Sequence, residues 1–262
     1  MPRGRRPGRA LVPAARTSPF PVARGLLRMV SNAVFRNPRT PNYSSFPLGQ
    51  ANTALTNPEA LPTITRLVVA TTNCGKFAEI VALLQGLRVS ILPLDRAGPV
   101  QVPPEGGDSF QDNARRKALA VAQQSGYWAL ADDSGLEVDA LGGAPGVRSA
   151  RFGNPGATDA DRSRLLLTRL QGVPLERRTA RFRCVMAVAD SGGRVWDSEG
   201  VCEGRIALAP HGVHGFGYDA VFEIPALGCT LAELDVATKN RVSHRGRALA
   251  GVREILRGRL DA

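Results

Sequence analysis

Residues 128–135 read Trp128-Ala129-Leu130-Ala131-Asp132-Asp133-Ser134-Gly135, an apolar run of strand length that meets two carboxylates, a hydroxyl and a glycine. Burying a carboxylate is costly unless it is paired or bound to a metal. Open α/β sheets place their ligand crevices at strand ends. We therefore expect the strand to end at Asp132 and the chemistry to lie there. Taken alone, Asp-Asp-Ser-Gly also fits a turn that reverses the chain.

The positive charge of the chain is unevenly spread. Of the net +11, residues 1–64 carry nine arginines and one acid, Glu59, and so hold +8, which leaves +3 for residues 65–262. The basic character therefore belongs to the N-terminal segment and says little about what the rest of the chain binds. With 262 residues, the chain is long enough for one or two domains with a sizeable core.

The cysteines and the apolar runs exclude several classes of protein. Four scattered cysteines form no Cys-x-x-Cys pair, which argues against structural zinc and against a disulfide framework. No run approaches the ~18 apolar residues of a membrane-spanning helix. We expect reduced thiols and a cytoplasmic location.

Residues 1–64 are rich in Pro, Arg, Ser and Asn, and we predict a basic, disordered N-terminal extension ahead of a catalytic domain at 65–262. Leu27, Val30 and Val34 lie on one helical face among arginines, and acids are nearly absent. This pattern resembles an organellar transit peptide, which makes an organellar location the alternative. Two alternatives stay open, a disordered tail without a targeting role and a true translation start at Met29. The excess of arginine over lysine runs through the whole chain, so it is weak evidence for a transit peptide.

The first polar loop of the domain has the pattern of an anion site. A strand pattern at 66–70 runs into Thr71-Thr72-Asn73-Cys74-Gly75-Lys76 and then into a helical pattern with Phe77, Ile80 and Leu84 on one side. The N–H groups at a helix start favour anions. Lys76 opposes the helix dipole there, which favours a bound phosphate. The spacing of a Walker loop is missing, and a solvated polar turn fits equally well.

The next segments bring an acid and two polar side chains. A strand pattern at 88–92 precedes a Pro/Gly-rich loop, 93–107, which holds Glu105. A helix follows, capped by Asp108 or Ser109 and running to about residue 124. Its Asn113 and Lys117 share one stripe. Glu105 and Lys117 also fit solvent-facing roles.

The second half of the chain ends in two donor clusters. A helix at 158–170 and a hairpin of strands at 180–189 and 194–202 are predicted. His214-Gly215-Phe216-Gly217-Tyr218-Asp219 then offers aromatic faces beside glycines, or alternatively an aromatic core plug. Lys239, His244 and Arg245 bring three donors to the start of a terminal helix, where an anion or a carbonyl oxygen would balance them.

Acidic and basic residues lie at the ends of successive predicted apolar elements, and together these residue types indicate one kind of chemistry. Mg²⁺ is held by one or two protein carboxylates together with substrate phosphates. Lysines and helix N-termini stabilise phosphate charge. We interpret the pattern as a metal-dependent enzyme on a nucleoside polyphosphate, with one carboxylate activating water.

Seven motifs in order also match a known family. They are Thr71-x-Asn73-x-x-Lys76, Glu105-x-Gly107-x-Ser109-Phe110, Asn113 with Lys117, Ala131-Asp132-Asp133-Ser134-Gly135-Leu136, Gly142-Gly143-x-Pro145-Gly146, Gly215-Phe216-Gly217-Tyr218-Asp219 and Ser243-His244-Arg245-Gly246. Residues 65–262 thereby resemble the inosine triphosphate pyrophosphatase family. The departures are Ala220 in place of a proline, His214 in place of a glycine and Asp112 in place of a glutamate. These departures concern the rim of the pocket.

The resemblance implies hydrolysis of dITP, ITP and XTP to the monophosphate and pyrophosphate, with Mg²⁺ as cofactor. The implied fold is a long mixed β-sheet flanked by helices, forming two lobes around a substrate cleft, in a homodimer. Glu105 and Asp133 would hold Mg²⁺, and Asp133 would be the general base, with Asp132 and Lys117 in support. The implied triphosphate ligands are Thr71, Thr72, Asn73, Cys74, Gly75, Lys76 and Ser134. The residues implied to frame the base are Phe216, Gly217, Tyr218, Asp219, Lys239, His244 and Arg245.

Two rival functions remain at this point. The first is a related pyrophosphatase that acts on modified pyrimidine or other unusual triphosphates. The second is a basic nucleic-acid-binding protein without catalysis, which rests on the charge of the chain alone. The +3 of residues 65–262 argues against it. We therefore expect a nucleotide substrate, with neither a membrane nor a specific nucleic acid as partner.

Overall fold

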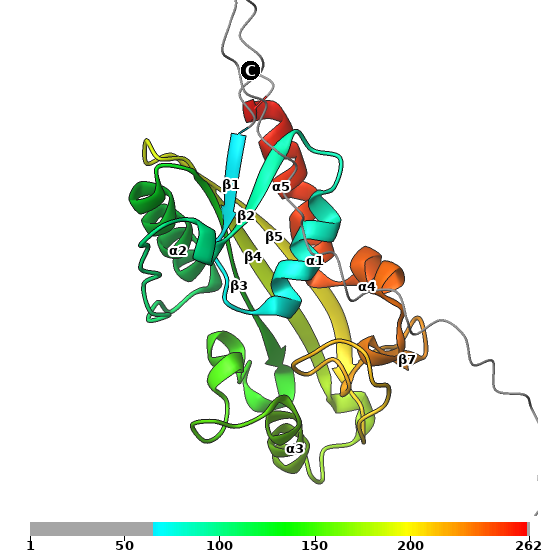
Figure 1. The fold of residues 1–262 in the computed structure, drawn as a ribbon. Helices are drawn as coiled ribbons and strands as arrows, with labels where there is room; N and C mark the ends of the chain where they lie inside the picture. The colour runs from blue at the N-terminus through cyan, green and yellow to red at the C-terminus, as the bar shows by residue number, and fades with distance from the viewer. Residues whose placement is uncertain (1–64, 261–262) are drawn as a thin grey trace, which may run out of the picture. The chain divides into compact units, whose positions relative to one another are not determined.

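The computed structural model describes residues 65–260, so the predicted N-terminal extension lies outside the described residues. A seven-stranded sheet in the order β2-β1-β3-β4-β5-β6-β7 runs through them (Figure 1). The strands are β1 (Thr65–Val69), β2 (Val89–Pro93), β3 (Trp128–Val138), β4 (Thr179–Ala189), β5 (Val195–Ile206), β6 (Phe222–Ile224) and β7 (Cys229–Thr230). The α-helices are α1 (Cys74–Leu84), α2 (Phe110–Ser125), α3 (Asp159–Arg169), α4 (Val236–Val242) and α5 (His244–Leu260). The 3₁₀ helices are η1 (Leu94–Arg96), η2 (Asp139–Leu141), η3 (Gly146–Arg151), η4 (Leu175–Arg177) and η5 (Leu231–Glu233).

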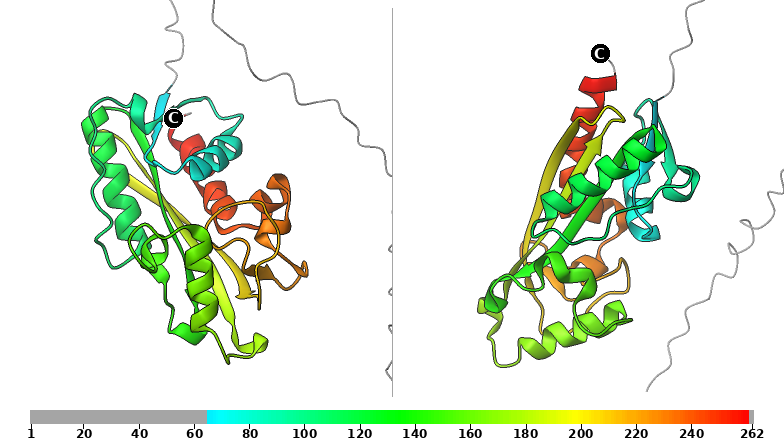
Figure 2. Two further views of the ribbon diagram at one scale, coloured as in Figure 1. Left: turned by 60° about the horizontal axis from the view of Figure 1, so that its bottom comes forward. Right: turned by 90° about the vertical axis from the view of Figure 1, so that its left-hand side faces the viewer.

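The sheet is mixed, as the sequence predicted. β1 is parallel to both β2 and β3, whereas each neighbouring pair from β3 to β7 is antiparallel. The predicted hairpin is the β4–β5 pair, which joins Thr179–Ala189 to Val195–Ile206. Helix α2 covers one face of the sheet, while α1 and α5 cover the other (Figure 2).

Alternation along β3 explains how one strand serves both helical layers. Successive side chains of a strand point to opposite faces. Ala129 and Ala131 pack against α2, whereas Leu130 packs against α1 and α5. The small residues of α2 let that helix lie close to the sheet.

A third cluster of buried residues lies toward the far end of the long strands. There Leu136 and Val138 of β3 pack with Leu166 and Leu170 at α3. The helices at the two ends thus enclose separate cores on one continuous sheet. This arrangement confirms the predicted α/β fold, with a long mixed sheet flanked by helices.

The prediction that a strand ends at Asp132 is wrong, and so is the alternative of a turn there. β3 continues to Val138 and pairs with β4 throughout, with Asp132 opposite Met186 and Asp133 opposite Val185. What ends at this level is β1, whose last residue, Val69, pairs with Leu130, and the following Ala70 N donates to Leu130 O at 2.8 Å. The carboxylates therefore lie where β3 loses its neighbour on one edge, in the middle of the strand.

Side chains cap three helix starts, and Ser109 at α2 is one of the two caps that the sequence predicted. Asn73 accepts a hydrogen bond from Lys76 N at α1, Ser109 accepts one from Asp112 N at α2, and Thr158 forms a capping box with Asp161 at α3. The four cysteines, all among the described residues, are unpaired. No helix within 65–260 has the length and apolarity needed to cross a membrane.

Candidate active site

The loop between β1 and α1 carries the first cation of the site. Thr71 Oγ1 accepts a hydrogen bond from Asn73 N at 3.2 Å, and Asn73 Oδ1 accepts one from Lys76 N at 3.0 Å. These bonds fix the loop at the helix start. The Lys76 ammonium then lies 2.9 Å from Asp132 Oδ2 on the neighbouring strand.

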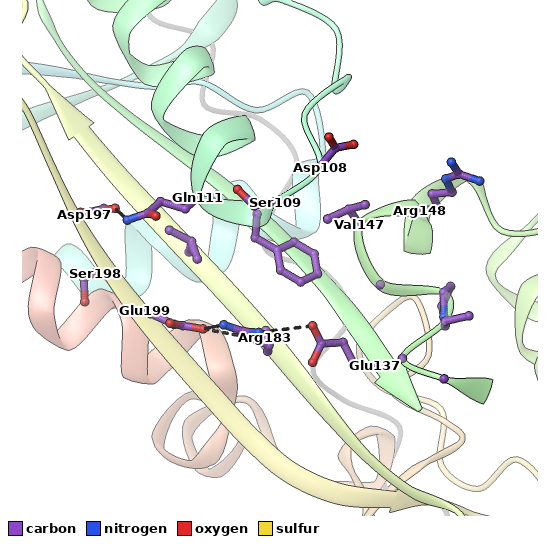
Figure 3. Close-up of a pocket in the computed structure, with 17 residues that line it drawn as sticks. Asp108, Ser109, Gln111, Glu137, Val147, Arg148, Arg183, Asp197, Ser198 and Glu199 are labelled. Carbon is purple, nitrogen blue, oxygen red and sulfur yellow. Dashed lines mark hydrogen bonds and ion pairs between the residues drawn. The ribbon is translucent and has the colours of Figure 1, made fainter. Parts of the chain in front are cut away.

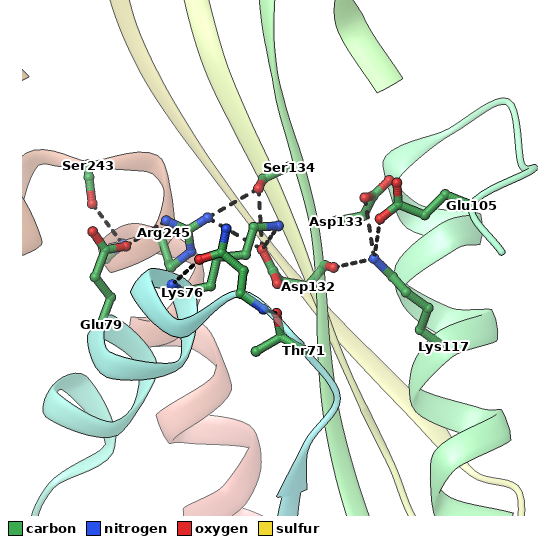
Figure 4. A network of polar contacts seen from close by, with 12 residues as sticks. Thr71, Lys76, Glu79, Glu105, Lys117, Asp132, Asp133, Ser134, Ser243 and Arg245 are labelled. Carbon is green, nitrogen blue, oxygen red and sulfur yellow. Dashed lines mark hydrogen bonds and ion pairs between the residues drawn. The ribbon is translucent and has the colours of Figure 1, made fainter. Parts of the chain in front are cut away.

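One oxygen of Asp132 gathers three donors (Figure 4). Besides Lys76, Asp132 Oδ2 accepts from Ser134 Oγ at 3.2 Å and from the Arg245 guanidinium at 3.4 Å. Burial alone would raise the pKa of Asp132, but Lys76, Arg245 and Lys117 outweigh it and hold that pKa well below its ordinary value. Asp132 is therefore ionised and acts as the common counter-ion of the cations around it.

Asp133 lies on the opposite face of β3, beside α2. Its Oδ2 accepts from Asn113 Nδ2 at 2.9 Å, and its Oδ1 is 3.4 Å from Lys117 Nζ. The same ammonium lies 3.1 Å from Glu105 Oε1 and donates to Asp132 O at 2.5 Å. Glu105 and Asp133 therefore converge on Lys117.

The two converging carboxylates have opposite tendencies to ionise. Burial and the nearby charge of Glu105 raise the pKa of Asp133 above its ordinary value, although Lys117 and Asn113 act against them. Burial would also raise the pKa of Glu105, but the Lys117 ammonium reverses the direction and lowers it. A carboxylate with a raised pKa is the better proton acceptor.

The loop that carries Glu105 is held from two sides. Arg151, at the end of η3, donates to Glu105 O at 2.7 Å. Asn113 Oδ1 accepts from Gly107 N at 2.9 Å, while the amide nitrogen of the same side chain binds Asp133. Asn113 thus ties the loop to the carboxylate on β3.

The donor set suits a hard divalent cation. Within residues 65–260, no group of three or more His, Cys, Asp or Glu side chains is arranged to enclose a metal ion. Two carboxylates, Glu105 and Asp133, lie close to the same ammonium group, that of Lys117. A pair of protein carboxylates completed by phosphate oxygens is the usual setting for Mg²⁺. The residues present therefore fit the predicted ion.

The aromatic loop, residues 214–219, contacts the loop 71–76, which is called the phosphate loop here after its predicted role. A Cβ atom on Gly75 would lie 3.0 Å from the Phe216 ring, so the glycine permits this contact. Lys239 Nζ lies 4.8 Å, and Arg245 Cζ 5.5 Å, from the centroid of the same ring. Asp219 Oδ2 accepts from Lys239 Nζ at 2.7 Å and from Phe216 N at 2.9 Å.

Glu79 of α1 is a site residue that the sequence analysis did not identify. Its two oxygens accept from Lys239 Nζ at 2.8 Å and from Arg245 at 2.6 Å. A glutamate on an amphipathic helix normally faces water, so the sequence carries no local signal for this role. Lys76, Asp132, Arg245, Glu79 and Lys239 thus form a chain of alternating charge from the phosphate loop to the aromatic loop.

The sequence of this chain is similar to that of proteins of one known family. The model of the Ham1 family matches residues 67–255. The chain belongs to the Ham1 family. A protein of Desulforamulus reducens named dITP/XTP pyrophosphatase is 49% identical over 191 residues, which cover 73% of this chain and 95% of that protein. Its namesake in Geobacter sulfurreducens is 47% identical over 193 residues, with 74% and 97% covered.

Two solved structures agree with this assignment. A HAM1 protein from Coxiella burnetii matches with a TM-score of 0.69 and 40% identity, covering 74% of this chain and 99% of that one. A nucleoside-triphosphatase, also named dITP/XTP pyrophosphatase, from Mycobacterium abscessus matches with a TM-score of 0.61 and 41% identity, covering 72% and 98%. The predicted family resemblance is thereby confirmed.

Five of the seven residues that the resemblance places at the base of the substrate are buried in this Ham1 chain: Tyr218, Asp219, Lys239, His244 and Arg245. Tyr218 is 3% exposed, and its hydroxyl donates to Ser149 O at 2.9 Å, so its ring serves as the core plug that the sequence left open. His244 is 5% exposed, and its ring stacks on Phe182 with centroids 4.6 Å apart. Burial, together with Arg245, holds the pKa of His244 well below its ordinary value.

Hollows of about 520–530 Å³ border both ends of the site. One is lined by Thr71, Thr72, Asn73 and Cys74 of the phosphate loop, and the other by Phe216, Gly217 and Asp219. A further hollow of about 680 Å³ lies over β3, β4 and β5 (Figure 3). Its lining includes none of the predicted site residues, and its Arg183 pairs with Glu137 and Glu199.

Proposed function

We propose that this chain hydrolyses the triphosphates of deaminated purines, dITP, ITP and XTP, to the nucleoside monophosphate and pyrophosphate. Its Ham1 relatives named dITP/XTP pyrophosphatase support the reaction class and the substrates. The convergence of Lys76 and Lys117 on the adjacent carboxylates of β3 supports a triphosphate lying across that strand.

The observation that carries the base specificity is a buried donor without a partner. Arg245 Nε and His244 Nδ1 are the two buried side-chain polar atoms of residues 65–260 that have no hydrogen-bond partner. Buried polar groups are normally paired. The keto oxygen at the purine 6-position would supply an acceptor to Arg245, whereas the amino group of adenine would face it with another donor. A pocket built around one hydrogen bond can discriminate by about 10⁴.

The proton acceptor in this proposal is Asp133. Its carboxylate would take a proton from the water that attacks the α-phosphorus, and Asn113 holds its Oδ2 at 2.9 Å. Lys76 and Lys117 would balance the charge that develops on the leaving pyrophosphate. Mg²⁺ held by Glu105 and Asp133 would supply further positive charge for the phosphate oxygens.

Pyrophosphate release from a panel of triphosphates tests the proposal. We expect release from ITP, dITP and XTP and little from ATP, GTP or the pyrimidine triphosphates. In Asp133→Asn we expect turnover to fall by about 10²–10⁴-fold with nucleotide binding largely kept. Equal release from ATP would contradict the specificity. Turnover near the wild-type rate in Asp133→Asn would contradict its role as the base.

The predicted homodimer and cytoplasmic location are also proposals. The native mass of the protein in solution tests the first. Fractionation of cells that express the full chain tests the second, with recovery in the soluble cytoplasmic fraction expected and recovery in an organelle supporting the alternative of a transit peptide.

A further inference from the structure

The loop that carries Phe216 closes on itself. Gly215 and Gly217 both have positive φ, 78° and 64°, a conformation that favours glycine. Asp219 completes the turn, because its Oδ2 accepts from Phe216 N at 2.9 Å and its N–H bonds to Phe216 O at 3.3 Å. Such a turn needs an external anchor to fix where its aromatic ring lies.

Helix α3 supplies such an anchor, because two of its side chains hydrogen-bond the backbone N–H and the backbone oxygen of Gly217. Asp159 Oδ2 accepts from Gly217 N at 2.7 Å, and Ser163 Oγ donates to Gly217 O at 3.4 Å. Positions four apart lie on the same helix face. Outside Gly217 and its chain neighbours, no heavy atom lies within 4 Å of the position that a Cβ on Gly217 would take. Helix α3 therefore holds this residue through hydrogen bonds to its backbone and not through packing against that position.

The Asp159 carboxylate divides its two oxygens between α3 and the loop, and it takes no part in the cap of the helix. Thr158 and Asp161 already form the capping box of the helix. Arg162 occupies Asp159 Oδ1 at 2.5 Å, which leaves Oδ2 to the loop. Asp159 lines the hollow of about 520 Å³ that also reaches Phe216 and Asp219.

A shift of the loop that carries Phe216 would change contacts both at the phosphate loop and at the cations of the terminal helices. The Phe216 ring abuts Gly75 of the phosphate loop and lies beneath the cations of Lys239 and Arg245. We propose that Asp159 is a positioning residue for nucleobase recognition, an inference that rests on the proposed function. By accepting the Gly217 N–H, Asp159 holds the Phe216 ring in its place against Gly75.

Two matched variants separate positioning from helix stability. Asp159→Ala removes the acceptor, whereas Asp161→Ala weakens the cap of the same helix without touching the loop. Asp159→Asn keeps an oxygen for Gly217 N–H and loses only the charge. The readouts are KM and kcat for ITP, the Kd of inosine monophosphate by calorimetry, and competitive inhibition by inorganic tripolyphosphate, which lacks a base.

We expect Asp159→Ala to raise the KM for ITP and the Kd for inosine monophosphate by about tenfold, the effect of one lost charge-assisted hydrogen bond. The kcat and the tripolyphosphate inhibition constant should stay within about twofold, Asp159→Asn should recover most of the loss, and Asp161→Ala should lower only the melting temperature. An unchanged KM in Asp159→Ala, an equal change in tripolyphosphate inhibition, or an equal rise in Asp161→Ala would overturn the inference. Absence of ITP hydrolysis by the wild-type protein would instead contradict the proposed function, and the calorimetric comparison would still test the positioning role.

Discussion

Asp132 and Asp133 are neighbours in the chain, yet their side chains lie on opposite faces of β3. Asp132 meets Lys76 and Arg245 on the side of α1 and α5, whereas Asp133 meets Lys117 on the side of α2. The period of two residues along a strand therefore places the two carboxylates among different cations, one on each face of the sheet. β1 ends at Val69, opposite Leu130, so Asp132 and Asp133 have a paired strand only on the side of β4.

The selectivity for the base should depend on the shape of Arg245 as well as on its charge. Arg245→Lys keeps a cation near Glu79 and Asp132 but removes the Nε donor and the planar fork. We expect the preference for ITP over ATP, measured as the ratio of kcat/KM values, to fall by roughly 10- to 100-fold. A ratio unchanged from wild type would show that another group reads the base.

Removal of the metal should abolish turnover, and Glu105 should set the metal requirement. We expect EDTA to stop pyrophosphate release and added Mg²⁺ to restore it. Glu105→Gln keeps the shape of the side chain but loses one of two carboxylates, so the Mg²⁺ concentration for half-maximal activity should rise by about tenfold or more. Titration of activity with Mg²⁺ checks this, and identical half-maximal concentrations would contradict the ligand assignment.

Gly135 should be intolerant of any side chain. A Cβ there would lie 2.4 Å from Gly146 O and 2.7 Å from Ser149 Oγ. Because a backbone oxygen cannot swing away, Gly135→Ala should lower the free energy of unfolding by about 2–3 kcal/mol in urea denaturation. Gly258→Ala is the control, since that position in α5 is open and alanine should stabilise the helix by up to about 1 kcal/mol. Equal stabilities of the two variants would refute the packing argument.

Stability should fall as the pH drops below about 6.5, the unfolded pKa of histidine. The folded pKa of His244 is depressed, by burial first and then by Arg245, so the unfolded state binds the extra proton in this range. The stabilising contribution is present above the unfolded pKa and is lost as the pH falls toward the folded pKa. Between pH 7.5 and 5.5, His244→Gln should weaken the pH dependence of the unfolding free energy by up to about 1.4 kcal/mol per pH unit.

The matched control for this measurement is His214→Gln, because the His214 side chain is exposed. That variant should keep the pH dependence of the wild type. An unchanged slope in His244→Gln would mean that the buried imidazole does not titrate differently in the two states.

Most helices and strands could be predicted from local sequence patterns, because the residues that determine each element lie within it or next to it. Ser109 caps α2, as one of the two predicted candidates, and α1 and α3 begin close to where the sequence placed them. Asn113 and Lys117 share one face of α2 as predicted, and both contact Asp133. In these cases hydrogen-bonding groups and spacing lie within a few residues of each other.

The errors arose where the partner is distant in the sequence. A charged pair normally ends a buried strand, but Arg245, 113 residues after Asp132, supplies part of the compensation that lets β3 continue. Glu79 likewise gains its role from Lys239, 160 residues later. Tyr218 looked available for stacking beside two glycines, and only the fold brings Ser149 O to its hydroxyl.

The position of the water attack tests the central claim most directly. Hydrolysis of ITP in ¹⁸O-labelled water with Mg²⁺, followed by mass spectrometry of both products, reports which phosphorus is attacked. With Asp133 activating water at the α-phosphorus, the label should enter inosine monophosphate and leave pyrophosphate unlabelled. Label in pyrophosphate, or release of inorganic phosphate in its place, would contradict the account.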